Sequence, residues 1–141
     1  MTMTANCQNP SSRPRRVIVA EDDYTLRGLI ASVLRSEGYE TVEARDGVEL
    51  LARIEEALVS RGERADSFLI VTDVCMPGVS GLDVLAILRC AHATTPVILI
   101  TAFGDRETYA EARELGASAV FDKPFDVDRL RAAVVDTAPP R

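Results

Sequence analysis

The chain has 141 residues, of which 47% are hydrophobic and 27% are charged, and its formal net charge is -6. This length suits one compact domain, and the composition excludes a disordered or collagen-like chain. The acidic balance disfavours direct binding to nucleic acid, because a phosphate backbone repels an anionic domain.

Short apolar runs alternate along the chain with segments of helical periodicity. In chain order, the pattern predicts a strand at 17–20, a helix across 26–34, a strand at 40–44, a helix across 48–58, a strand at 68–71, a helix across 82–88, a strand at 97–100, a helix across 105–115, a strand at 118–121 and a helix across 127–134. The polar residues 1–14 predict a flexible arm, residues 15–136 the domain, and residues 137–141 a tail in which Pro139 and Pro140 cannot continue a helix.

Five strands that alternate with five helices predict parallel pairing with right-handed crossovers. The fold class is therefore α/β, a doubly wound, flavodoxin-like sandwich around a parallel sheet. In such folds, ligands bind beyond the carboxyl ends of the strands.

The sequence gives little indication of membrane insertion, secretion or a cysteine-based metal site. No apolar run approaches the ~18 residues that a membrane-spanning helix needs, and the N-terminus lacks the apolar core of a signal peptide. The three cysteines, Cys7, Cys75 and Cys90, match no zinc-binding spacing and suit a reducing compartment. We therefore expect a cytoplasmic protein that does not bind a membrane.

Polar residues follow four of the expected strands. Glu21-Asp22-Asp23 follows the first strand, Asp73 the third, Thr101 the fourth and Lys123 the fifth. Each feature alone is ordinary, since an acidic triplet often only begins a helix. Together, at one edge of a sheet, they predict a site for phosphoryl transfer.

Clustered carboxylates favour a hard divalent cation with oxygen ligands, Mg²⁺ or Mn²⁺, and such a cation leaves positions for phosphoryl oxygens. A hydroxyl and an ammonium would then help to neutralise the transferring group. A carboxylate can itself be the nucleophile and become an aspartyl phosphate.

The sequence resembles the response-regulator receiver family. The resemblance is carried by VIVAEDD at 17–23, TDVCMPGVSGL at 72–82, ITAFGD at 100–105 and KPF at 123–125, and it extends over about residues 15 to 136. It implies a (βα)5 fold with strand order 2-1-3-4-5.

By this resemblance, Asp73 is the phosphoacceptor. Glu21 and Asp22 are the acidic pair, with Asp22 a direct metal ligand and Glu21 acting through water, and Asp73 and the backbone carbonyl of Cys75 complete the metal site. Thr101 and Lys123 contact the phosphoryl group, and the Lys123–Pro124 peptide bond is cis.

Two positions depart from the family pattern. The first acid is Glu21, where aspartate is common, and its reach is longer by one methylene. Val120 stands where the family often has Tyr or Phe coupled to the threonine. The aromatic residue is instead Phe121, which should face the other side of the strand.

The resemblance implies phosphorylation of Asp73 by a sensor histidine kinase or a phosphotransfer protein in a two-component phosphorelay. The chain would be a signalling switch rather than an enzyme, catalysing only its own phosphorylation and dephosphorylation. Its fourth helix, fifth strand and fifth helix would form an output surface or a homodimer interface, with Arg106, Tyr109 and Arg129 as candidate residues. No output domain follows Asp136, so we expect a single-domain regulator or a fragment of a longer one.

Three alternatives stay open. A phosphohydrolase with an aspartyl nucleophile would need a second acid two residues after Asp73, where Cys75 stands. A non-phosphorylated interaction module of the same fold would have lost an acid, the threonine or the lysine. A flavin-binding protein would need a first loop rich in Ser, Thr and Gly rather than Glu21-Asp22-Asp23.

Overall fold

The computed structural model describes residues 14–141. Cys7 and the predicted arm, apart from Pro14, lie outside this range. In chain order the elements are β1 (Arg16–Ala20), α2 (Tyr24–Ser36), β2 (Glu40–Ala44), α3 (Gly47–Glu55), the π-helix η2 (Glu56–Ser60), β3 (Phe68–Asp73), α4 (Gly81–Cys90), β4 (Val97–Thr101), α5 (Arg106–Glu114), β5 (Ala119–Asp122) and α6 (Val127–Thr137). None of the helices in this range is long and apolar enough to cross a membrane.

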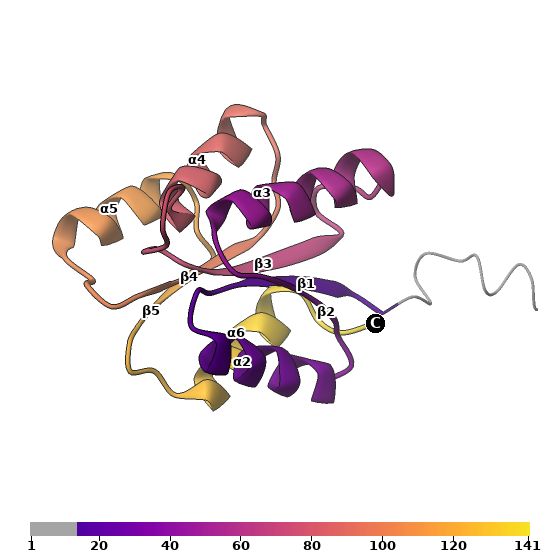
Figure 1. Ribbon diagram of the computed structural model, residues 1–141, viewed down its shortest axis with the longest axis horizontal. Helices are drawn as coiled ribbons and strands as arrows, with labels where there is room; N and C mark the ends of the chain where they lie inside the picture. Colours follow the sequence, from indigo (N-terminus) through magenta and orange to yellow (C-terminus); the bar gives the residue numbers. More distant parts are fainter. Residues whose placement is uncertain (1–13) are drawn as a thin grey trace, which may run out of the picture.

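The five strands form one parallel sheet in the order β2-β1-β3-β4-β5. Helices α3, α4 and α5 cover one face of the sheet, and α2 and α6 cover the other (Figure 1). This architecture confirms the predicted doubly wound fold and its strand order.

The sheet separates two apolar cores because successive strand residues point to opposite faces. Ile18 and Ile70 pack with α3, α4 and α5, whereas Val17 and Leu69 pack with α2 and α6. Every residue of β1, β3 and β4 is buried, as expected for strands covered on both sides.

Each α-helix begins at a residue whose side chain accepts a hydrogen bond from a backbone N–H of the first turn. This bond satisfies one of the donors that a helix leaves unpaired at its start. The N-cap residues are Asp23, Asp46, Ser80, Asp105 and Asp126. These short polar residues fix where the chain turns from the sheet edge into each helix.

Two of the strands extend beyond their apolar runs and end at a predicted site residue. Asp73 is the last residue of β3 and Thr101 the last residue of β4, whereas the apolar pattern alone predicts ends at 71 and 100. Backbone hydrogen bonds continue past these ends, with Val74 N–H donating to the Ile100 carbonyl at 2.7 Å and Lys123 N–H to the Thr101 carbonyl at 2.8 Å. The polar residues are therefore held by the rigid sheet rather than by loops.

The chain after α6 contacts the domain near the opposite edge. The buried hydroxyl of Tyr39 donates to the Ala138 carbonyl at 2.6 Å, and Arg15 Nε donates to the Pro139 carbonyl at 3.0 Å. Burial raises the pKa of the Tyr39 hydroxyl to about 12, so it stays a donor at neutral pH.

Candidate functional site

Asp73 lies at the centre of the carboxyl edge of the sheet and is only 2% exposed. Its Oδ1 accepts a hydrogen bond from the Cys75 backbone N–H at 2.9 Å, and its Oδ2 accepts one from Lys123 Nζ at 2.6 Å. Both carboxylate oxygens are thus engaged, which fixes the orientation of the carboxylate.

The three acids after β1 lie in different environments. Glu21 is buried, and its backbone N–H donates to the Ala44 carbonyl, which continues the pairing of β1 with β2. Asp22 is exposed. Asp23 caps α2 by accepting a hydrogen bond from the Leu26 backbone N–H at 3.1 Å. Only the first two acids face Asp73.

Carboxylate oxygens of Glu21, Asp22 and Asp73 all lie within 4.8 Å of one another. Like charges at this spacing repel, and a divalent cation would remove that repulsion. Glu21 Oε1 accepts no well-aligned hydrogen bond from any residue in the range 14–141. Among the described residues, the close cationic partner of this buried oxygen is the Lys123 ammonium at 2.9 Å, and the all-oxygen set of three carboxylates fits Mg²⁺ or Mn²⁺.

Burial raises the pKa of the Glu21 carboxyl to about 7, and a hydrogen bond with Asp22 acts in the same direction. Lys123 and the backbone N–H of Asp23 act in the opposite direction without cancelling the effect of burial. Near neutral pH, Glu21 of the metal-free site is therefore partly protonated, and a bound cation would displace this proton.

Lys123 is the only lysine in the chain and lies directly after β5. Its ammonium is 2.6 Å from Asp73 Oδ2 and 2.9 Å from Glu21 Oε1. Burial alone would lower the pKa of Lys123, but its interactions with the two carboxylates outweigh burial and raise it. The side chain is therefore a permanent cation at the edge of the site.

Thr101 reaches the same edge from β4. Its neighbour Ile100 pairs with Asp73 in the sheet, and Thr101 itself pairs with Asp122. The buried hydroxyl accepts a hydrogen bond from the Phe103 backbone N–H at 3.1 Å. The structure thus brings all six predicted site residues to one edge of the sheet, including Cys75, whose thiol is exposed.

Two glycines near the site allow close packing that was not predicted from the sequence. A Cβ on Gly81 would overlap the Asp73 carbonyl oxygen, and a Cβ on Gly47 would lie 2.7 Å from Val79 Cβ. Gly81 allows α4 to begin against Asp73, and Gly47 allows α3 to approach the loop before α4. The sequence feature that could have identified Gly81 is its position at the start of a predicted helix, because glycine has a low helix propensity.

Val120, which departs from the expected pattern, and the neighbouring aromatic Phe121 lie on opposite faces of β5. Val120 packs with the core on the α3, α4 and α5 side, and Phe121 packs on the α2 and α6 side, with its ring centroid 6.5 Å from that of Phe125. Phe121 therefore does not face the Thr101 side of the strand in the way that an aromatic at 120 would. The Lys123–Pro124 bond is cis, as the resemblance implies.

A protein-family model described as "Response regulator receiver domain" matches residues 17–135. Sporulation initiation phosphotransferase F of Bacillus subtilis (strain 168) is 34% identical over 119 residues, which cover 84% of this chain and 90% of that protein. Transcriptional regulatory protein PdtaR of Mycobacterium tuberculosis (strain ATCC 25618 / H37Rv) is 37% identical over 122 residues, covering 86% of this chain but 55% of that protein. The chain thus spans about half the length of PdtaR.

Solved structures of response regulators also resemble this chain in fold. The receiver domain of Francisella response regulator 1452 superposes with a TM-score of 0.75 at 32% identity, covering 87% of this chain and 95% of that one. Vibrio cholerae chemotaxis protein CheY4 superposes with a TM-score of 0.73 at 26% identity, covering 86% and 97%.

Proposed function

Because this chain belongs to the response regulator receiver family, as a phosphoacceptor of two-component signalling, we propose that Asp73 is the residue that accepts the phosphoryl group. The observation that carries this assignment is the environment of its carboxylate, which is buried, held by Lys123 at 2.6 Å, and adjacent to the oxygens of Glu21 and Asp22. Among the described residues, only Glu21 shares this lysine and this acidic cluster, and the sequence resemblance assigns Glu21 to the metal rather than to the phosphoryl group.

Glu21, Asp22, Asp73 and the backbone carbonyl of Cys75 would hold the cation. When bound, Mg²⁺ or Mn²⁺ would supply positive charge for the phosphoryl oxygens, as expected for phosphoryl transfer. The protein residues supply the remaining charge and the positioning.

In the proposed transfer, a carboxylate oxygen of Asp73 attacks the phosphorus of a phosphohistidine. A P–O bond forms, the P–N bond breaks, and its electron pair returns to the imidazole, which takes up a proton. Lys123 leaves its ion pair with Glu21 to bind a phosphoryl oxygen, and the Thr101 hydroxyl donates a hydrogen bond to another. The product is an acyl phosphate on Asp73.

The donor would be a sensor histidine kinase or a phosphotransfer protein, and the surface formed by α5, β5 and α6 would engage a downstream protein or a second copy of the chain. The added phosphate brings roughly one further negative charge to the sheet edge. Such a local change can bias a two-state element that a partner recognises. Cys75 and Cys90 are both free, which supports a cytoplasmic location.

A switch is favoured over a phosphohydrolase that turns over external substrates. Such an enzyme needs a general acid two residues after its nucleophile, and this place is occupied by Cys75, whose side chain points to solvent. A non-phosphorylated module is disfavoured because the acids, the threonine and the lysine are all present at one edge of the sheet.

Intact-mass spectrometry after incubation with acetyl phosphate and Mg²⁺ tests the assignment. We expect one phosphoryl adduct on the wild type and none on Asp73→Asn. Acetyl phosphate can also acetylate Lys123, and the adduct mass separates the two reactions. A wild type that gains no phosphoryl group, or an Asp73→Asn variant that does, would overturn the assignment.

A further inference from the structure

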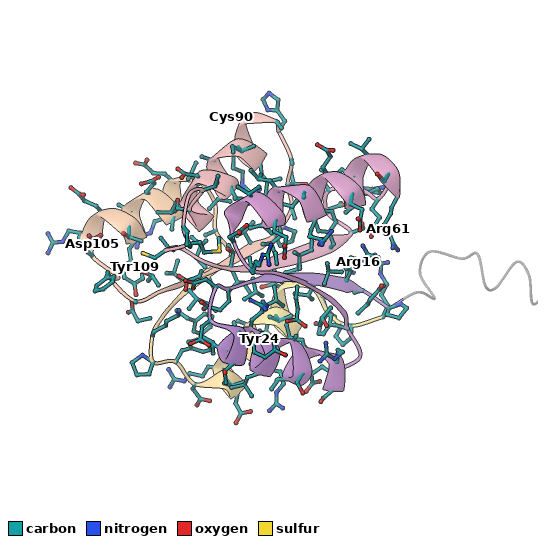
Figure 2. All side chains as sticks on the ribbon, viewed as in Figure 1. Arg16, Tyr24, Arg61, Cys90, Asp105 and Tyr109 are labelled. Atoms are coloured by element: carbon teal, nitrogen blue, oxygen red, sulfur yellow. The ribbon has the colours of Figure 1, made fainter. Side chains whose placement is uncertain are left out.

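A hydrogen bond outside the acidic site links α5 to the end of β5. The Tyr109 hydroxyl donates to Asp122 Oδ2. Tyr109 projects from α5 toward the strand ends (Figure 2). Both residues lie on the surface that α5 and β5 share, and the carboxylate raises the pKa of the Tyr109 hydroxyl, which therefore stays a donor.

Asp122 stands between two residues of the proposed phosphoryl site. It immediately precedes Lys123, and it pairs with Thr101 in the sheet. The Lys123 backbone N–H donates to the Thr101 carbonyl at 2.8 Å, which closes this short ladder. A displacement of either site residue is therefore transmitted to Asp122 through the backbone.

The loop between β4 and α5 packs beside the two side chains of the Tyr109–Asp122 hydrogen bond. A Cβ on Gly104 would overlap Asp122 Oδ1 and lie 2.7 Å from Tyr109 Cε2, so the glycine backbone fills the space beside both side chains. The same loop is tied to Thr101, whose Oγ1 accepts the Phe103 N–H at 3.1 Å. Thr101, Phe103 and Gly104 thus form a continuous chain of contacts to Tyr109 and Asp122.

A hollow of about 300 Å³ lies beside the tyrosine ring, lined by Tyr109, Arg113, Ala117 and Val120. Val120 occupies the position at which the sequence resemblance led us to expect an aromatic residue. A valine there leaves this space open, so that the Tyr109 ring has room to leave Asp122.

We propose that the Tyr109–Asp122 hydrogen bond is a resting-state latch that phosphorylation of Asp73 opens. The proposal rests on the proposed function of Asp73. When Thr101 moves to contact the phosphoryl group, the Phe103 N–H follows its hydroxyl and Gly104 is drawn from the tyrosine and the carboxylate. Tyr109 then moves into the hollow beside Val120 and changes the surface of α5 and β5.

The movement of Tyr109 is measured by NMR on the full chain carrying ε-¹³C-labelled tyrosine. The chain has three tyrosines. The signal that is missing from the spectrum of Tyr109→Phe belongs to Tyr109. We expect the Tyr109 signal to shift when acetyl phosphate and Mg²⁺ label the protein, whereas the signal of buried Tyr39, bound to the Ala138 carbonyl, stays in place. Intact mass of the same sample reports phosphorylation.

Rates of labelling by acetyl phosphate provide a second readout. Because the latch opposes the phosphorylated arrangement, Tyr109→Phe and Asp122→Ala should each accelerate labelling roughly three- to tenfold, the effect of losing one hydrogen bond. The double variant should be no faster than either single variant, since both remove the same bond. Tyr24→Phe, which alters an exposed ring on α2, is the matched control and should label at the wild-type rate.

The outcomes separate the latch from the function on which it rests. A labelled wild type with an unmoved Tyr109 signal, or additive effects of the two substitutions, would overturn the latch and leave Asp73 as the acceptor. A wild type that is never labelled would overturn both.

Discussion

Lys123 Nζ lies 2.9 Å from Glu21 Oε1, so the lysine proposed to bind a phosphoryl group is shared, before any phosphate arrives, with a buried acid. This sharing couples metal binding, protonation and phosphorylation at one edge of the sheet. It also determines how the site should respond to pH and to substitution.

Binding of Mg²⁺ should tighten as the pH rises through the pKa of Glu21. Burial raises this pKa to about 7, and the proton must leave before the carboxylate can meet a cation. Between about pH 8 and about pH 6, the affinity measured by titration calorimetry should fall by about tenfold. Glu21→Gln should bind Mg²⁺ more weakly and lose this pH dependence, and equal wild-type affinities at the two pH values would contradict the prediction.

The same proton sets the stability of the metal-free protein. Because the folded pKa of Glu21 is raised from 4.5 to about 7, the protonated acid favours the folded state below pH 4.5, and this contribution is lost as the pH rises through 7. Urea denaturation in the presence of a chelator should therefore show stability that declines across this window in the wild type. Glu21→Gln should decline less.

Lys123→Ala should destabilise the metal-free protein by about 1–3 kcal/mol, since it leaves two buried carboxylates without their cation. Saturating Mg²⁺ should recover most of this loss, because the metal neutralises the same charges. Lys123→Arg keeps a positive charge and is the matched control: it should retain more stability than Lys123→Ala, but its forked head should still slow labelling of Asp73. A loss in Lys123→Ala that Mg²⁺ does not reduce would argue against an electrostatic origin.

Gly81→Ala should destabilise the fold and slow labelling of Asp73, because the added methyl would overlap the Asp73 carbonyl oxygen. Gly28→Ala is a contrasting control within α2, since a methyl added there would meet no atom within 4 Å outside its own helix and its chain neighbours. Replacing a helical glycine by alanine there should stabilise the protein by about 0.5–1 kcal/mol. Thermal or urea unfolding compares the two, and the expected result is a change of opposite sign.

Arg89 near the end of α4 should tolerate substitution poorly. Its guanidinium donates to the carbonyls of Ala93, Thr95, Leu115 and Gly116 at 2.7–3.3 Å, which joins the ends of α4 and α5. Arg89→Lys should cost about 2–3 kcal/mol in unfolding free energy, because an ammonium cannot reach four carbonyls in this fork. Arg106→Lys on exposed α5 is the matched control and should change stability by less than about 0.5 kcal/mol. Equal effects at the two positions would show that the fork contributes little.

Most of the fold could be predicted because its signals are local. Apolar runs such as Val17 to Ala20 can only be buried on both faces, and short polar residues such as Asp46 cap the helices where the periodicity begins. The sheet edge then follows from parallel pairing, which brings Asp73, Thr101 and Lys123 together although they are distant in sequence.

The remainder depends on distances that a sequence does not contain. The raised pKa of Glu21 reflects the burial of its side chain, and nothing in the composition of the triplet distinguishes this buried acid from the capping acid Asp23. The fork at Arg89 depends on where the loop after α4 runs. The Tyr109–Asp122 hydrogen bond requires α5 to lie against β5 at one particular height, which the weak apolar pattern across 105–115 does not specify.

The parallel sheet gathers Glu21, Asp73 and Lys123 from three distant stretches of the polypeptide. During synthesis, the acids leave the ribosome well before the lysine that balances them. A nascent chain consequently has no complete phosphoryl site until residue 123 has emerged and β5 has docked. The ability to accept a phosphoryl group is thus acquired last, and chains truncated before residue 123 would not take part in phosphotransfer.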